Sequence, residues 1–426
     1  MSKRSTILTA AFVVLLLTAG LGYHALQRTA PPNPAPTAQS EPAPHASLLY
    51  GRITTRDGVT FEGRLRFGGN QEAFWGDYFN GVKKENPWAA LVPPDRLPGS
   101  SRPFEIFGFQ LFSLSDPVDL KRPFMARFGD LSRIEARGRD VRVTLKSGTV
   151  LDLDRFSASD FDDGVRIWDT LHGVTSLDSL RISSIEFLPA SEAGPAPTRL
   201  HGSVQTAHGL FTGFIQWDRQ ESFASGELTG QSAQGAVRLR FGDAISITPQ
   251  SPDTALVSLR DGRQLRLANP RQLGNDNLGL YVDDPRYGRV LVSWSAFRHA
   301  GFTPAPSGPA YDEFAPGHPL TGTVITRSGQ RLAGRLVFDL DESESTETLD
   351  APAHGVDYTL PFSLIASIAL DSPAPLITLH SGEPLQLEPK GDLSPNNAGL
   401  LIFVDARTTP EYLPWSEVRQ IDFNRN

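Results

Sequence analysis

Two neighbouring carboxylates, Asp283 and Asp284 in the run VDDPRYGRV, are of a type and spacing that could support acid–base chemistry. A pair of carboxylates can divide the roles of general acid and nucleophile between them. Adjacent residues of a strand point to opposite faces, however, and DDPRYG has the composition of a reverse turn. We therefore interpret the two aspartates as strand and turn residues and predict no catalytic dyad here.

Clustered oxygen ligands occur in three loops that align with one another, 159–164 (SDFDDG), 274–279 (GNDNLG) and 394–399 (SPNNAG). Carboxylate and amide oxygens bind calcium, but the spacing before Gly164 does not fit an EF-hand loop, and the third copy has no carboxylate. An Asn or Asp side chain that closes a turn ahead of a glycine is the simpler interpretation. The sequence predicts no metal ion and no other cofactor.

Zinc chemistry and nucleophilic catalysis also lack a local pattern. The nine histidines are scattered, and the close pair His201 and His208 flanks a single strand without a third ligand. The strings HExxH, GxSxG, Walker A and GxGxxG do not occur. We predict no catalytic residue, although a triad assembled from distant residues stays open as an alternative.

The best candidate for a binding site is an insertion at about 76–121, which interrupts the first of the repeated units described below. It concentrates aromatic residues together with two lysines, the amphipathic and charged side chains that anchor protein partners. The alternative is an extra hairpin and cap, whose phenylalanines pack on the first unit. We predict four partner-binding residues here, Tyr78, Lys83, Lys84 and Trp88.

The composition excludes several classes of protein. The 426 residues include no cysteine, which rules out disulfides, thiolate metal sites, a thiol nucleophile and a lipidated N-terminal cysteine. Lys plus Arg number 40 against 48 Asp plus Glu, so the formal charge of -8 gives no attraction for a polyanion. We expect no nucleic acid among the partners.

Residues 1–28 have the pattern of an export signal. Lys3 and Arg4 precede an apolar run that is long enough either for a signal peptide or for a retained membrane anchor. Residues 29–47 are rich in proline and alanine, which is typical of an extended linker. We expect an exported, periplasmic protein that is tethered to the inner membrane through this segment, or released where the segment is cleaved.

A β-unit of roughly fifty to sixty residues recurs along the chain. Each copy contains a dipeptide ending in glycine between two alternating apolar runs, which is the favoured connection of a β-hairpin. The six dipeptides are Asp57-Gly58, Ser147-Gly148, His208-Gly209, Asp261-Gly262, Ser328-Gly329 and Ser381-Gly382. Later in each unit an aromatic residue or a leucine is expected to open a closing strand; these are Phe128, Leu180, Phe241, Trp294, Phe362 and Trp415. The sequence therefore predicts an all-β protein.

The six units form three tandem pairs, because a proline-rich break separates each pair from the next. We expect repeat pair 1 at 48–188, repeat pair 2 at 200–302 and repeat pair 3 at 320–424, and we call them modules 1, 2 and 3. Residues 189–199 and 303–319 are the expected linkers between the modules.

Each module opens with a hairpin whose second strand carries a glycine on its apolar face, namely Gly63, Gly213 or Gly334. A glycine there lets the sheet bend or lets another backbone come close. The run at 322–339, GTVITRSGQRLAGRLVFD, and partly the run at 202–218, resembles the start of Sm-like and SH3-like small β-barrels. The resemblance implies three tandem domains that each contain two small barrel units, and a six-bladed β-propeller is the alternative.

Two classes of function follow as hypotheses. The leading one is a non-enzymatic envelope or periplasmic binding or scaffold protein, whose tandem β-modules bind another protein or an envelope polymer. The alternative is an envelope hydrolase with its site between the insertion and the first repeat pair. A deep polar pocket with convergent carboxylates would favour the hydrolase, and a flat aromatic surface would favour binding.

Overall fold

The computed structural model describes residues 46–68, 70–93, 96, 103–106, 109–113, 122–169, 171–190, 198–404 and 408–425. All described residues belong to one compact unit, Ala43–Asn426. The expected export signal, most of the linker at 29–47 and much of the insertion after Val92 lie outside the described residues. In the described part of the chain, no helix has the length and apolar character that a membrane span requires.

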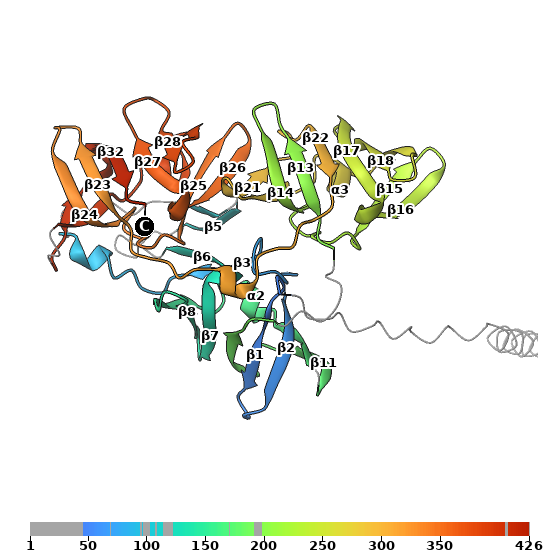
Figure 1. The fold of residues 1–426 in the computed structure, drawn as a ribbon, viewed down its shortest axis with the longest axis horizontal. Helices are drawn as coiled ribbons and strands as arrows, with labels where there is room; N and C mark the ends of the chain where they lie inside the picture. Colours follow the sequence, from blue (N-terminus) through green and yellow to red (C-terminus); the bar gives the residue numbers. More distant parts are fainter. Residues whose placement is uncertain are drawn as a thin grey trace, which may run out of the picture. The chain divides into compact units, whose positions relative to one another are not determined.

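The protein is all-β, and most of its strands form three large sheets (Figure 1). Module 1 forms the sheet β11 (Gly173–Leu177), β10 (Val165–Asp169), β2 (Thr60–Phe67), β1 (Tyr50–Thr55), β12 (Ile182–Phe187), β7 (Leu131–Arg137), β8 (Asp140–Leu145) and β9 (Val150–Asp154). Module 3 forms the sheet β29 (Pro384–Gln386), β28 (Leu376–Leu379), β27 (Ile365–Ala369), β32 (Val418–Phe423), β23 (Thr321–Thr326), β24 (Arg331–Val337), β30 (Leu400–Val404) and β31 (Glu411–Leu413).

The sheet of module 2 also takes in two strands of module 3. Its order is β16 (Gly235–Arg240), β15 (Glu227–Ser232), β19 (Gln264–Ala268), β18 (Thr254–Leu259), β17 (Ala244–Ser251), β22 (His299–Phe302), β13 (His201–Gln205), β14 (Leu210–Gln216), β20 (Leu280–Asp284), β21 (Gly288–Val292), β26 (Val356–Pro361) and β25 (Thr348–Ala353). Two smaller sheets pair β3 (Tyr78–Val82) with β6 (Pro123–Arg127) and β4 (Pro103–Ile106) with β5 (Phe109–Ser113). The short α-helices of the described residues are α2 (Ser159–Asp162) and α3 (Pro270–Leu273).

One strand order is repeated in all three modules. The order β11-β10-β2-β1-β12-β7-β8-β9 of module 1 corresponds to β21-β20-β14-β13-β22-β17-β18-β19 in module 2 and to β31-β30-β24-β23-β32-β27-β28-β29 in module 3. The first hairpin pairs with strands of the second unit, because β1 pairs with β12 and β2 pairs with β10. The two units of a module are therefore interleaved in one sheet. Among the described strands, no sheet closes into a barrel and none is a separate four-stranded blade.

All six predicted hairpins are present. Five of the six turn glycines have a positive φ, such as 85° at Gly58, a conformation that glycine adopts without strain. Gly209 is the exception, and its turn is held by the Thr206 hydroxyl, which accepts a hydrogen bond from the Gly209 N–H at 3.0 Å.

The prediction that an aromatic residue opens each closing strand needs a correction. Four of these residues are buried but begin a 3-10 turn immediately before the strand; they are Phe128, Phe241, Phe362 and Trp415. Leu180 occupies the matching place in the sequence of module 1, yet its side chain is 66% exposed. Regular spacing therefore located the closing strands but did not identify a core residue in every unit.

Glycines lie opposite each other in the first hairpin of every module. In module 3, Gly322 faces Gly334, and a Cβ at Gly334 would overlap the carbonyl oxygen of Phe403 in β30. Modules 1 and 2 repeat the arrangement with the pairs Gly51–Gly63 and Gly202–Gly213. The glycine prediction is confirmed, because these positions let the backbone of a neighbouring strand come close.

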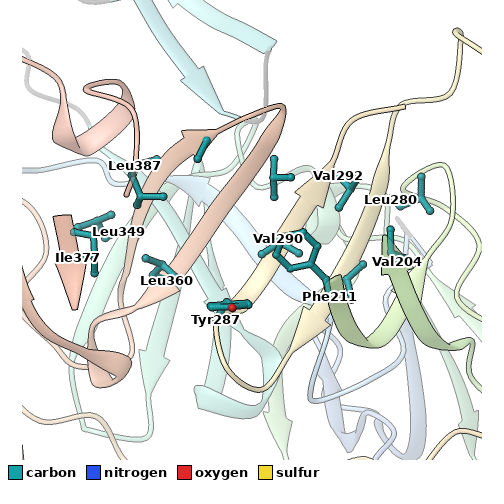
Figure 2. Packing of buried hydrophobic residues seen from close by; sticks show 14 of the residues in the cluster. Val204, Phe211, Leu280, Tyr287, Val290, Val292, Leu349, Leu360, Ile377 and Leu387 are labelled. Carbon is teal, nitrogen blue, oxygen red and sulfur yellow. The ribbon is translucent and has the colours of Figure 1, made fainter. Parts of the chain in front are cut away.

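One apolar core runs through modules 2 and 3 without a break. Figure 2 shows part of it, with Val290 and Val292 of β21 on one side and Leu349 and Leu360 of the β25–β26 hairpin on the other. The two modules therefore bury apolar surface together instead of forming separate cores.

A second core fills module 1 and includes Tyr311 and Phe314. Both residues belong to the segment 303–319, which the sequence led us to expect as a linker. The Tyr311 hydroxyl donates to the carbonyl of Leu131 at 2.7 Å, and Lys146 Nζ donates to the carbonyl of Phe314 at 3.1 Å. Part of this proline-rich segment is therefore packed on module 1.

Each module has a further hairpin between its first hairpin and the closing strand, which we call the lateral hairpin. It consists of β3 and β6 in module 1, of β15 and β16 in module 2, and of β25 and β26 in module 3. In every module, a side chain two residues before the polar loop accepts a backbone N–H from the first strand of the lateral hairpin. Ser157 accepts from Val82 at 2.8 Å, Gln272 from Thr229 at 2.8 Å and Asp392 from Asp350 at 2.6 Å. In module 1, most of the insertion lies between the two strands of the lateral hairpin, after the end of β3 and before the start of β6.

Candidate functional site

The base of the insertion is joined to module 3 by buried charges. Lys83 is 7% exposed, and its Nζ donates to Oδ1 of Asp341 at 2.8 Å and to Oε1 of Glu347 at 2.9 Å. Arg122, where the chain returns to β6, donates to the carbonyl of Asp339 at 2.8 Å. Burial alone would lower the pKa of Lys83, but the charges of Asp341 and Glu347 outweigh burial and raise it. Lys83 therefore stays charged in the folded protein.

Several carboxyl groups of module 3 near this junction have a raised pKa. Burial, reinforced by the charge of Asp357, raises the pKa of Asp350 to about 6. Burial also raises the pKa of Glu342 and of Asp392 well above the ordinary values. The matching backbone hydrogen bonds make Gln71 in module 1 and Glu221 in module 2 the equivalents of Glu342, and burial raises the pKa of Glu221 as well.

The other predicted partner-binding residues differ in accessibility. Tyr78 is 5% exposed, and the Arg289 guanidinium lies 4.3 Å from the centre of its ring. Trp88 is half-buried and meets Phe403 of module 3 edge-on, with ring centres 6.3 Å apart. Lys84 is exposed and pairs with an aspartate of β8 at 2.8 Å. The partner-binding role stays a prediction, and Lys84 and Trp88 are the members that solvent reaches.

A second polar junction connects module 1 with module 2. Arg289 is buried, its Nε lies 3.1 Å from Oδ1 of Asp283, and it donates to the carbonyl of Gly76. Asp284 instead accepts the backbone N–H of Thr212 through Oδ2 at 2.7 Å. The two neighbouring aspartates therefore have separate structural contacts, as expected of strand and turn residues.

The turn interpretation of the polar loops is confirmed in two modules. Asn277 Oδ1 accepts the N–H of Gly279, and Asn397 Oδ1 accepts the N–H of Gly399, both at 2.8 Å. In module 1 the loop instead begins the helix α2. Across the described residues, no group of three or more His, Asp or Glu side chains is arranged so that it could hold a metal ion.

Modules 2 and 3 are joined by strand addition. β26 of the lateral hairpin of module 3 pairs antiparallel with β21 of module 2, and Tyr358 lies opposite Val290. The Tyr358 ring packs edge-on against Phe211 and Tyr287, with ring centres 5.9 and 5.8 Å away. We call the second strand of a lateral hairpin (β6, β16 or β26) the donor strand and the outermost strand of a module (β11, β21 or β31) the acceptor strand.

The donor strand of module 2 is open on its outer side. β16 ends its sheet, and no described strand pairs with its outer edge. A groove of about 420 Å³ lies between this lateral hairpin and β19, lined by Thr229–Gln231, Ala236–Arg238 and Ala268–Pro270. The free N–H and C=O groups of such an edge can pair with an added strand.

The acceptor strand of module 1 is open as well. β11 ends its sheet, and no described strand pairs with its outer edge. Val174 on this strand is 54% exposed, and Leu171 and Leu180 at either side of it are 88% and 66% exposed. Large apolar side chains gathered at one edge are typical of an interaction surface.

The comparisons with known proteins identify no family. No protein-family model and no curated protein matches the chain. The solved structure of a streptogramin B lyase is similar over 70% of this chain and 94% of that chain, with 8% identity and a TM-score of 0.14. A catalytically inactive virginiamycin B lyase from Staphylococcus aureus with quinupristin is similar over 61% of this chain and 96% of that chain, with 11% identity and a TM-score of 0.15. At such TM-scores the likeness carries no argument about this chain.

The sequence interpretation missed the lateral hairpins and with them the open edges. Gln234-Gly235 and His354-Gly355 are two further dipeptides of the kind used to find the first six hairpins, and both glycines have a positive φ. They connect the strands of the lateral hairpins in modules 2 and 3. A search for every such dipeptide would have found these hairpins, but not which edges stay open.

Proposed function

We propose that this chain is a non-enzymatic binding or scaffold protein of the bacterial envelope, and that it takes up an extended partner segment at the open donor strand of module 2. The observation that carries the proposal is the β21–β26 junction, where the chain itself uses strand addition to join two modules. The equivalent donor strand of module 2 has no described partner on its outer edge, and the groove lies on its inner side, toward β19. Main-chain pairing at the outer edge would supply the affinity for an added strand.

The partner we propose is another protein or an envelope polymer, with no nucleic acid, because the formal charge of -8 favours no polyanion. Lys84 and Trp88 at the insertion form a second contact surface in this proposal. We also propose that residues 1–28 export the chain to the periplasm and either tether it to the inner membrane or are cleaved. Cell fractionation with N-terminal sequencing of the mature protein tests the location.

At a finer level of the fold, we propose that each module derives from two small Sm-like or SH3-like barrel units whose strands became interleaved. The sequence run at 322–339 supports this proposal, because its hairpin and its glycine bend recur at the start of every module. An experimental structure of module 3 that showed no curled first unit would contradict it.

An envelope hydrolase is the second candidate, because carboxylates gather where the insertion meets module 3; Asp339 and Asp341 are buried, and Glu347 and Asp392 are half-buried. Their contacts favour a structural role. Asp392 accepts the backbone N–H of Asp350 at 2.6 Å, and Glu347 Oε2 accepts the N–H groups of Ser343 and Glu344 at 2.6 and 3.0 Å. Carboxylates engaged in this way are not positioned around a substrate.

The test is capture from envelope extract with the tagged full chain and two proline variants. Ser232 and Gly235 close a two-residue turn, so the N–H of Ala236 points to the open edge, and Ala236→Pro removes it. Ala233→Pro is the matched control, because proline suits the first central position of a turn. A partner lost with Ala236→Pro and kept with Ala233→Pro supports the proposal.

A partner retained by both proline variants but lost when residues 84–121 are deleted would move the site to the insertion. Hydrolytic turnover of an envelope polymer, abolished by a single substitution in the carboxylate cluster, would overturn the binding proposal in favour of the hydrolase.

A further inference from the structure

We propose that two copies of this chain associate by strand addition, with donor strand β16 of one copy pairing antiparallel with acceptor strand β11 of the other. The inference rests on the proposed use of β16 as a binding edge and names its occupant. Figure 1 labels both strands, which end different sheets of the same chain.

The first argument is that each remaining lateral hairpin already serves a neighbouring module. The lateral hairpin of module 3 pairs with β21 of module 2. That of module 1 carries the insertion, whose Trp88 packs on Phe403 and whose Arg96 lies 5.1 Å from the ring centre of Tyr412 in β31. Among the described strands β6 and β31 also end their sheets, but the contacts of the insertion place the lateral hairpin of module 1 against module 3. The donor strand and the acceptor strand without such a described neighbour are β16 and β11, and strands of these two kinds pair at the β21–β26 junction.

The second argument is that the β21–β26 junction supplies a register for β11 and β16. Gly173 of β11 is equivalent to Gly288 of β21, because each glycine pairs with the aspartate that ends the preceding strand. Gly235 takes the place of Val356, because each opens the second strand of its lateral hairpin. Transferring the pairs of the β21–β26 junction puts Val174 opposite Arg238, Thr175 opposite Val237 and Ser176 opposite Ala236.

The third argument is that module 1 has a counterpart of the two aromatic rings against which Tyr358 packs in module 2, a pair that we call the ring platform. Phe211 and Tyr287 form that platform, with ring centres 5.9 Å apart. Their equivalents Phe61 and His172 are 4.8 Å apart. In the register above, Val237 of the second copy would lie where Tyr358 lies and would cover these rings with an apolar side chain.

The fourth argument is the apolar surface at β11. Leu171, Val174 and Leu180 are exposed in one chain, and covering them with a second copy would remove apolar surface from water, which favours association. Modules 1 and 2 are already joined elsewhere, through Arg199, which donates to the carbonyl of Trp75 at 2.7 Å. The contact we propose therefore takes place between copies, either as two junctions in a two-fold dimer or as a head-to-tail chain.

Cysteine crosslinking tests the register, because the natural chain has no cysteine to interfere. Full-length Val174→Cys carrying one tag is mixed with full-length Arg238→Cys carrying another and oxidised, and the same is done with Thr175→Cys and Val237→Cys. Adjacent antiparallel pairs alternate in side-chain distance, so one of the two mixtures has the closer geometry. Val150→Cys, at a similarly exposed position of the edge strand β9, replaces Val174→Cys as the control.

We expect a mixed-tag disulfide dimer in at least one test mixture, roughly tenfold above the Val150→Cys control, because association raises the local thiol concentration. The unmodified full chain should also show a mass of two or more copies by light scattering, and Ala236→Pro should reduce it to one copy. A monomeric unmodified chain, or crosslinks no stronger than the control, would overturn the inference.

Two further outcomes separate this inference from the proposed function. If the double variant Val174→Cys with Arg238→Cys crosslinks only within one chain, the second copy is the wrong occupant. If the chain stays monomeric but Ala236→Pro loses an envelope partner, strand addition at β16 stands and its occupant is another protein. If Ala236→Pro changes neither the mass nor any captured partner, both proposals fail.

Discussion

Lys83 and Asp341 stand 258 positions apart in the chain, yet the Lys83 ammonium lies 2.8 Å from a carboxylate oxygen of Asp341. Both side chains are buried, so the pair was removed from water when module 1 met module 3. A buried charge that loses its partner is costly, because the remaining charge keeps the desolvation penalty without the attraction. This pair and its neighbour Glu347 therefore make the attachment of the insertion sensitive to single substitutions.

Replacing Lys83 by methionine tests this attachment. We expect Lys83→Met to lower the free energy of unfolding by about 3–5 kcal/mol, because Asp341 and Glu347 would lose the ammonium that pairs with both of them. Denaturant unfolding followed by tryptophan fluorescence measures the change. Lys84→Met is the control, since Lys84 is exposed and should give little or no change. Equal effects of the two substitutions would contradict the buried junction.

Asp350 gives a prediction for the pH dependence of stability. The pKa of this carboxyl group is raised from 3.8 to about 6 in the folded protein. At pH values between 3.8 and about 6, the folded state therefore binds more protons than the unfolded state, and the contribution of Asp350 to stability falls as the pH rises through that range. Asp350→Asn should therefore be more stable than the natural protein at pH 8, by an amount on the order of 2 kcal/mol, and equally stable below pH ~4.

Thermal unfolding at a series of pH values measures this difference. Asp253→Asn, which removes an equal charge from an exposed turn, is the control for the loss of one negative charge. If Asp350→Asn is instead the less stable protein at pH 8, the carboxylate is stabilising and the assigned direction is wrong.

The glycine bend of module 3 gives a packing prediction. Gly334→Val should destabilise the protein by about 1–3 kcal/mol or prevent folding, because its Cβ would overlap the Phe403 carbonyl oxygen in β30. The adjacent Ala333→Val is the control, since Ala333 is exposed and valine suits a strand. Melting temperatures compare the two. A melting temperature unchanged by Gly334→Val would show that β30 does not approach this closely.

The proline-rich segment between modules 2 and 3 gives a fourth prediction. Phe314→Ala should cost about 3–5 kcal/mol of stability, because Phe314 belongs to the core of module 1. Phe156→Ala is the control, since Phe156 is an exposed phenylalanine of the same module and should be nearly neutral. Denaturant midpoints report both. If Phe314→Ala leaves the denaturant midpoint unchanged, the segment is a free linker and not part of the core of module 1.

Patterns that depend on near neighbours were readable from the sequence. A glycine dipeptide between alternating runs specifies a hairpin because backbone conformation at the turn is a local property, and all six such hairpins formed. The glycine in the second strand of each first hairpin could be interpreted for the same reason, because glycine has no side chain and the residue type alone predicts a close approach of another backbone. Leu180 shows the limit, because its spacing matched the repeat while its side chain faces solvent.

Residue types and their spacing along the chain were enough to predict an all-β protein of repeated hairpins, with no thiol and with an acidic charge. The folded chain was needed to show that Lys83 is an internal ion-pair partner and that Tyr311 and Phe314 enter the core of module 1. It also showed that β26 pairs with the edge of β21, whereas no described strand pairs with the outer edges of β16 and β11. The reason is physical: hairpin formation depends on residues a few positions apart, whereas burial and edge pairing depend on which distant surfaces meet, and similar repeats can meet in several ways.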